Sequence, residues 1–124
     1  MALTTAFRDY LAAKLVGGAA ALFDNANAHI GVGNSTTVFS AAHTDLQGAS
    51  KFRKPMDATY PQASNGAMTF RSTFATGDAN FAWEEWGVFN AASGGTMMNR
   101  VVQGNGTKAS TETKQVTVTI TLSV

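Results

Sequence analysis

The stretch that decides the fold is residues 116–124, which read VTVTITLSV in the 124-residue chain. Aliphatic residues alternate here with threonine and serine, and a period of two is the pattern of a strand with one buried face. No charged residue interrupts the strand, so it would promote aggregation if it formed a bare edge. We therefore expect this strand to be paired inside a sheet or across a subunit boundary.

Upstream segments carry further strand signals. Met68, Phe70 and Phe74 share one face of a segment that follows the turn signal Asn65-Gly66. Further strands are predicted over residues 28–32, 81–89 and 96–102. We expect residues 66–124 to consist of antiparallel strands joined by polar, glycine-containing loops.

The N-terminal segment has a different period. Leu3, Phe7, Leu11 and Leu15 recur every four residues, which predicts one amphipathic helix over residues 3–17. Glycines follow this segment and supply a stop signal. It is the only part of the chain with a clear helical pattern.

Residues 33–61 show no sustained period and contain both prolines. We interpret them as a long ordered loop with room for one short strand. Loops of this length are uncommon in compact domains and usually serve a function or a contact, so we expect an extended arm that lies on a neighbouring protein. The whole pattern predicts one domain over residues 1–124, mainly β: a β-sandwich-like antiparallel domain with one N-terminal amphipathic α-helix.

Composition favours an assembly component. Hydrophobic residues make up 44% of the chain and charged residues 14%, against about 25% charged residues in an average protein. The net charge of +1 gives no basic face for nucleic acid, and we expect no nucleic-acid partner. Without cysteine, a secretory signal or a membrane-length apolar run, the chain is expected to be made in a cytoplasm and to have no membrane partner.

Adjacent Glu84 and Glu85 are the first candidates for catalysis. Neighbouring residues on a strand point to opposite faces, so the two carboxylates cannot flank one substrate bond. A buried carboxylate needs a partner, and we expect a structural ion pair between Glu85 and either Arg71 or Arg100. We therefore expect no catalytic residue and no enzyme.

Cofactor and metal motifs are weak. His29, His43, Asp45 and Asp24 could contribute to a metal site, but their spacing matches no known motif. The run Gly31-Val32-Gly33 begins a nucleotide-loop pattern that fails at Thr36. We expect neither a metal nor a cofactor.

One basic cluster consists of Lys51, Arg53 and Lys54, with Phe52 between them. Such a cluster can hold single-stranded nucleic acid, but it is more often a solvated patch or a docking point for an acidic partner. We include its four residues among the candidates for an interface.

Large aromatic residues crowd the segment FAWEEWGVF, residues 81–89. By strict alternation, Phe81, Trp83 and Phe89 share a face with Glu85, while Trp86 lies opposite. Both faces are then partly apolar, which predicts a strand covered on both sides and in contact with a partner. We include these four aromatic residues among the interface candidates; a sugar-binding platform at a tryptophan is the alternative.

Four short motifs give the chain a resemblance to small virion proteins of tailed bacteriophages. They are residues 28–35 (AHIGVGNS), 44–48 (TDLQG), 68–71 (MTFR) and 85–90 (EWGVFN). Their order is similar to that of the N-terminal module of phage tail-collar fibre proteins, over residues 27–100. Trp86 replaces that family's aliphatic residue, and no shaft or receptor-binding tip follows, so the chain also resembles capsid decoration (cement) proteins.

The resemblance implies attachment and assembly. We expect a non-enzymatic structural component of a tailed-phage virion, assembled in the bacterial host cytoplasm. The first expectation is a capsid decoration protein that binds the major capsid protein; the alternative is a tail-collar, spike or fibre-attachment protein, and the second alternative is a carbohydrate-binding host-adhesion module. The implied partners are copies of itself, as a trimer or larger symmetric oligomer, and another virion protein.

Overall fold

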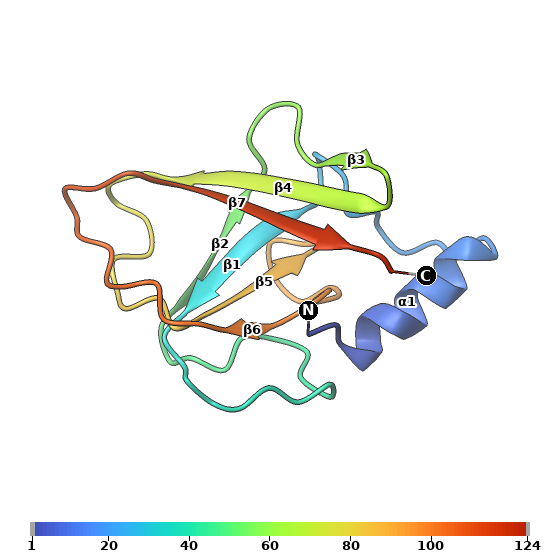
Figure 1. The fold of residues 1–124 in the computed structure, drawn as a ribbon, viewed down its shortest axis with the longest axis horizontal. Coiled ribbons are helices and arrows are strands. Elements are labelled where there is room, and N and C mark those ends of the chain that lie inside the picture. The colour runs from blue at the N-terminus through green and yellow to red at the C-terminus, as the bar shows by residue number, and fades with distance from the viewer. Residues whose placement is uncertain (1, 124) are drawn as a thin grey trace.

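A computed structural model describes residues 2–123 as two antiparallel sheets packed face to face, with one helix beside them (Figure 1). The mainly β, sandwich-like class predicted from the sequence is confirmed. In chain order the elements are α1 (Thr5–Leu15), β1 (His29–Gly33), β2 (Lys51–Pro55), β3 (Gln62–Ser64), β4 (Ala67–Phe74), β5 (Glu85–Phe89), β6 (Val101–Val102) and β7 (Lys114–Thr121).

The first sheet has the strand order β2-β1-β5-β6, and the second has the order β3-β4-β7. Strand β1 lies in the middle of its sheet, with Val32 opposite Phe52 on β2 and Trp86 on β5. Strand β7 pairs with β4 along its whole length, from Lys114 to Thr121. Its other edge pairs with no strand in the described part of the chain.

The core lies between the sheets and is built from the inward faces of both. Phe70, Phe74 and Ile120 contribute from the second sheet, and Ile30 and Val88 from the first. Each large aliphatic or aromatic side chain buried in this way contributes about 1.5–3 kcal/mol. Burial of these alternate side chains is what fixes the register of β4 and β7.

The helix is shorter than predicted. Leu3 forms an isolated bridge with Asn99, and Thr4 caps the first turn by accepting the N–H of Phe7 at 3.1 Å. Phe7 is the buried residue of α1, whereas Leu15 is 78% exposed. The four-residue spacing therefore predicted the helix correctly. The predicted bounds of 3–17 are too long, and the predicted apolar face included Leu15, which is exposed. Within residues 2–123, no helix has the length and apolar character needed to cross a membrane.

The loop predicted over 33–61 contains β2 as its one short strand. Three predicted strand bounds were wrong: the C-terminal strand ends at Thr121, the strand predicted over 81–89 begins only at Glu85, and the strand predicted over 96–102 shrinks to Val101–Val102. The last difference has a local cause, because the side chain of Asn99 accepts the N–H of Val88 at 3.1 Å and interrupts the regular ladder. Val124, the last residue of the predicted C-terminal strand, lies outside the described residues.

Candidate functional site

Glu85 organises the most polar part of the interior. It is the first residue of β5, and it is 1% exposed. Its Oε1 accepts hydrogen bonds from Gln47 N at 2.9 Å and Arg100 Nε at 2.7 Å. Its Oε2 accepts from Gly48 N at 2.7 Å and Ser35 N at 3.2 Å. The four acceptor positions of the carboxylate are therefore all occupied by groups of its own chain.

Arg100 neutralises this carboxylate. Both side chains are fully buried, and of the two arginines considered for Glu85 only Arg100 contacts it. Arg100 also donates from Nη1 to Thr37 O at 2.9 Å. Arg71 instead binds Asp57, with Nε and Oδ2 2.9 Å apart. Removing either member of the buried pair would leave an uncompensated charge inside the protein.

Residues 34–50, here called the arm, are held to the first sheet by these hydrogen bonds. The arm crosses the outer face of that sheet, and its residue Leu46 packs against Phe89 and Met97 in a second small apolar cluster. A side chain at Gly48 would collide with Asn34 and Glu85, so only glycine allows this close approach. The predicted double cover of β5 is therefore present, and the arm of the same chain supplies one of its layers.

The outer side of the arm is apolar at one point. Val38 is 84% exposed, and Val102 beside it is 39% exposed. With Phe39 they line a shallow hollow of about 420 Å³. We call this surface the arm patch, defined by Val38, Phe39 and Val102. Sequence reasoning did not single out these three residues, although the pair Val38-Phe39 stands out as apolar within an otherwise polar loop.

The basic cluster is largely occupied by internal contacts. Lys51 and Arg53 both bind Asp45, and Lys54 binds Asp78 at 2.6 Å. Partial burial raises the pKa of the Asp45 carboxyl, but hydrogen bonds from Lys51, Leu46 N and Arg53 outweigh it and hold the pKa below its ordinary value.

Arg53 also places its guanidinium 3.6 Å from the centre of the Phe89 ring. It donates to two backbone carbonyls, those of Ala91 and Gly94, at 2.9 Å each. The Arg53 side chain therefore holds the turn after β5 in place by hydrogen bonds. Phe52, between the basic residues, packs partly buried against the main core.

The aromatic candidates divide into buried and half-buried residues. Trp83 and Phe89 are 4% and 0% exposed, so they belong to the chain's own interior. They do not share a face: Trp83 precedes β5 and packs on Phe74 at 5.0 Å, while Phe89 lies in the cluster under the arm. Phe81 and Trp86 are half-buried against the main core. Within β5 the predicted alternation is confirmed, with Glu85 and Phe89 on one face and Trp86 on the other. It fails for Trp83 because the strand does not extend back to that residue.

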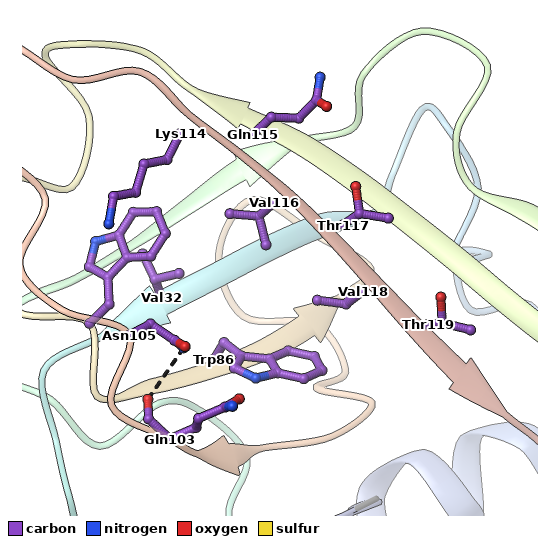
Figure 2. Close-up of a pocket in the computed structure, with 11 residues that line it drawn as sticks. Val32, Trp86, Gln103, Asn105, Lys114, Gln115, Val116, Thr117, Val118 and Thr119 are labelled. Atoms are coloured by element: carbon purple, nitrogen blue, oxygen red, sulfur yellow. Dashed lines mark hydrogen bonds between the residues drawn. The ribbon is translucent and has the colours of Figure 1, made fainter.

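Trp86 lies in a groove of about 520 Å³ between β7 and the segment that follows β6. Figure 2 shows Val116 and Val118 on the side of β7 that faces the Trp86 ring, with Gln103 and Asn105 across from them. Lys114, at the start of β7, lies 5.2 Å from the centre of the Trp83 ring. We call this feature the β7 groove.

The remaining candidates do not converge. His29 Nδ1 contacts Asn27 O at 2.8 Å, and His43 Nδ1 accepts from Ser40 N at 3.2 Å. Among residues 2–123, no group of three or more histidine or acidic side chains is placed to hold a metal ion.

Comparison of the chain with family models, with curated proteins and with solved structures gave no match. The function is therefore argued from the arm patch, the β7 groove and the sequence motifs.

Proposed function

We propose that this protein is a non-enzymatic structural component of a tailed-phage virion, acting as a capsid decoration protein that binds the major capsid protein. The observation that supports the proposal is the arm patch. An exposed apolar surface on a rigidly anchored loop suits docking to a larger assembly, because little conformational freedom is lost on binding. The motif resemblance and the low content of charged residues point the same way.

The arm would act as a preformed docking element. Three hydrogen bonds from the arm to Glu85, and one from Arg100 to Thr37 O, hold the two ends of the arm on the sheet. Val38 projects from the arm, so it can insert into an apolar pocket of a partner as an anchor residue. The basic residues under the arm, already paired with Asp45 and Asp78, would stabilise the loop and leave recognition to the apolar surface.

A matched pair of valine variants tests the docking surface. Val38 and Val16 are exposed to similar extents, 84% and 88%, but Val16 lies at the end of α1 away from the arm. We expect Val38→Asp to remove the protein from purified particles while Val16→Asp leaves incorporation unchanged, both variants melting like the parent. Equal incorporation of the two variants would contradict docking through the arm patch.

Copy number in purified particles separates the possible sites on the virion. Quantitative mass spectrometry is expected to give a copy number per particle that matches that of the major capsid protein in proportion. A low number in proportion to tail proteins would favour the alternative, a tail-collar, spike or fibre-attachment protein. Recovery only from the cytosol of infected cells, with none in particles, would end the virion proposal.

A carbohydrate-binding role has one supporting observation. Trp86 is half-buried in a groove that also presents the amides of Gln103 and Asn105, and sugars bind by stacking on aromatic rings beside such groups. Glycan binding that is lost in Trp86→Ala but kept in Phe52→Leu would support this role. Trp83 is unsuited to it, because its ring is buried.

A further inference from the structure

The sheets end in four edges, and three of them carry features that block pairing with another chain. The β2 edge reads KFRKP and is charged and closed by a proline, while β3 and β6 are only three and two residues long. Natural proteins use such charges, prolines and short strands to prevent edge-to-edge association. The fourth edge, β7, has eight residues, contains no proline and carries one charge, Lys114.

Backbone geometry shows which groups of β7 are free. Leu122 donates its N–H to Gly66 O at 2.9 Å, and the β4–β7 register then turns the even-numbered residues of β7 toward β4. The odd-numbered residues Gln115, Thr117 and Thr119 direct their N–H and C=O groups away from β4. Within residues 2–123, these groups have no hydrogen-bond partner.

Side chains beside this edge are only partly covered. Val116 and Val118 point toward the core but remain half-buried, whereas Ile120 further along the same face is 1% exposed. Trp86 lies below them in the β7 groove (Figure 2). A strand added next to β7 would extend the second sheet over this groove and cover the three half-buried side chains.

We propose that the added strand is β7 of a second copy of this chain, paired antiparallel about a two-fold axis. The charge pattern selects this arrangement. Antiparallel pairing carries the two copies of Lys114 to opposite ends of the interface, whereas parallel in-register pairing would place them side by side. The sequence KQVTVTIT then brings only threonine, valine, isoleucine and glutamine together at the centre.

Two registers satisfy the exposed hydrogen-bonding groups. Odd-numbered residues must face odd-numbered residues, so the two-fold axis passes beside Thr117 or beside Val118. In the second register, Thr117 lies opposite Thr119 of the partner subunit. Such pairing uses a sheet edge as a recognition surface, with main-chain hydrogen bonds for affinity and alternate side chains for specificity.

The two-fold pairing differs from the trimer expected from the sequence, because an isologous contact closes with two copies. It is argued from the β7 edge alone and holds whether or not the protein belongs to a virion. A dimer that is absent from particles removes the virion proposal and leaves this one standing. A monomer that is abundant in particles does the reverse.

Sedimentation equilibrium of the full chain gives the first test. We expect a species of twice the 13.0 kDa chain mass, and Thr119→Pro, which removes one outward N–H, to raise the dissociation constant at least tenfold. Thr119→Ala keeps the N–H and serves as its control. A monomer or a trimer of the parent chain, or a Thr119→Pro dimer of parental strength, would overturn the proposal.

Cross-linking tests the register, since the chain has no cysteine of its own. Val118→Cys or Thr117→Cys is expected to form a disulfide-linked dimer on mild oxidation, because cross-strand partners lie within disulfide range. Ser93→Cys, in an exposed loop, is the control. Cross-linking at neither β7 position, or equally at Ser93→Cys, would contradict β7 pairing.

A charge swap guards against a variant that fails to fold. Thr117 and Thr119 are exposed, so replacing both by lysine, or both by glutamate, should leave the monomer intact. Each double variant alone is expected to be monomeric, and an equimolar mixture is expected to form a mixed dimer. Dimers of the lysine variant by itself would count against the pairing, as would glycan binding in the β7 groove by a protein that stays monomeric.

Discussion

Strand β5 has both faces covered by its own chain, whereas β7 has one covered face and one unpaired edge. At β5 the cover is a loop, and a loop can lie on a sheet only if its backbone groups find acceptors there. Glu85 supplies those acceptors and Arg100 neutralises the resulting charge. Among residues 2–123 no such polar anchor lies at the β7 edge, and the edge keeps the groups that another strand could use. One side of the molecule is completed internally, and we propose that the other is completed by a second copy.

The largest expected effect comes from breaking the anchor at β5. Arg100→Met leaves the Glu85 carboxylate buried without its cation, and we expect the free energy of unfolding to fall by about 3–5 kcal/mol. Urea denaturation measures this loss. Arg8→Met, which breaks the exposed pair of Arg8 with Asp9, should change stability by less than about 0.5 kcal/mol. Similar losses of stability in both variants would show that the buried ion pair stabilises the fold no more than the exposed pair does.

A smaller loss of the free energy of unfolding is expected when the arm is crowded without a change of charge. In Gly48→Ala the new methyl group would meet Asn34 and the Glu85 carboxylate, so the arm must shift, at a cost of about 1–3 kcal/mol. Thermal melting and hydrogen exchange at Gln47 and Ser35 would report the shift. Gly77→Ala meets no atom within 4 Å and is the matched control. Unchanged exchange in the arm of Gly48→Ala would contradict the close approach.

Lys108 provides a comparable anchor in the segment before β7. Its side chain is 1% exposed, and its Nζ donates to Asn80 Oδ1 at 2.8 Å. Lys108→Met removes this donor and leaves a partly buried acceptor unpaired, with an expected loss of about 1–2 kcal/mol. Lys14→Met, on the helix, is expected to cost less, because Lys14 is only partly buried and its contact with Ala20 O is exposed. Chemical denaturation compares the two, and an equal loss would contradict the ranking.

The smallest effect concerns pH. The pKa of Asp45 is lower in the folded chain than in the unfolded chain, because hydrogen bonds from Lys51, Leu46 N and Arg53 outweigh the effect of partial burial. Its contribution is therefore complete above the unfolded value of about 3.9 and is lost as the pH falls through the lower folded value.

The pair is partly exposed, so this contribution is only about 0.2–1 kcal/mol. Asp45→Asn should weaken stability at neutral pH by that amount and flatten its decline below about pH 4. Denaturation curves at a series of pH values measure both effects. An unchanged acid slope in Asp45→Asn would show that other carboxylates control it.

Local patterns gave much of the fold. Alternation predicted β7, the aromatic run predicted the doubly covered β5, and the four-residue spacing predicted α1. Bounds were less accurate wherever a side chain takes over a backbone role, as Asn99 does for Val88 and Thr4 does at the helix start. The Asn99 contact joins residues 11 apart in sequence and depends on how two strands pack, so no local pattern contains it. The Thr4 cap joins residues only three apart and is a local signal.

The candidate surfaces were harder to predict than the fold. The interface residues chosen for size or charge, such as Phe89 and Arg53, turn out to contact each other inside the chain. Val38 and Phe39 were passed over because two apolar residues in a polar loop carry no period. Only the fold shows that the arm is anchored beneath them.

By itself the sequence determined that β7 would be a strand with an uncharged threonine face, because alternation is a local property of neighbouring residues. The tertiary structure alone decided that β7 is an edge, that Arg100 and not Arg71 neutralises Glu85, and that the cover of β5 comes from residues 34–50. Those outcomes depend on which distant segments meet, and that is set by packing the whole chain around one core.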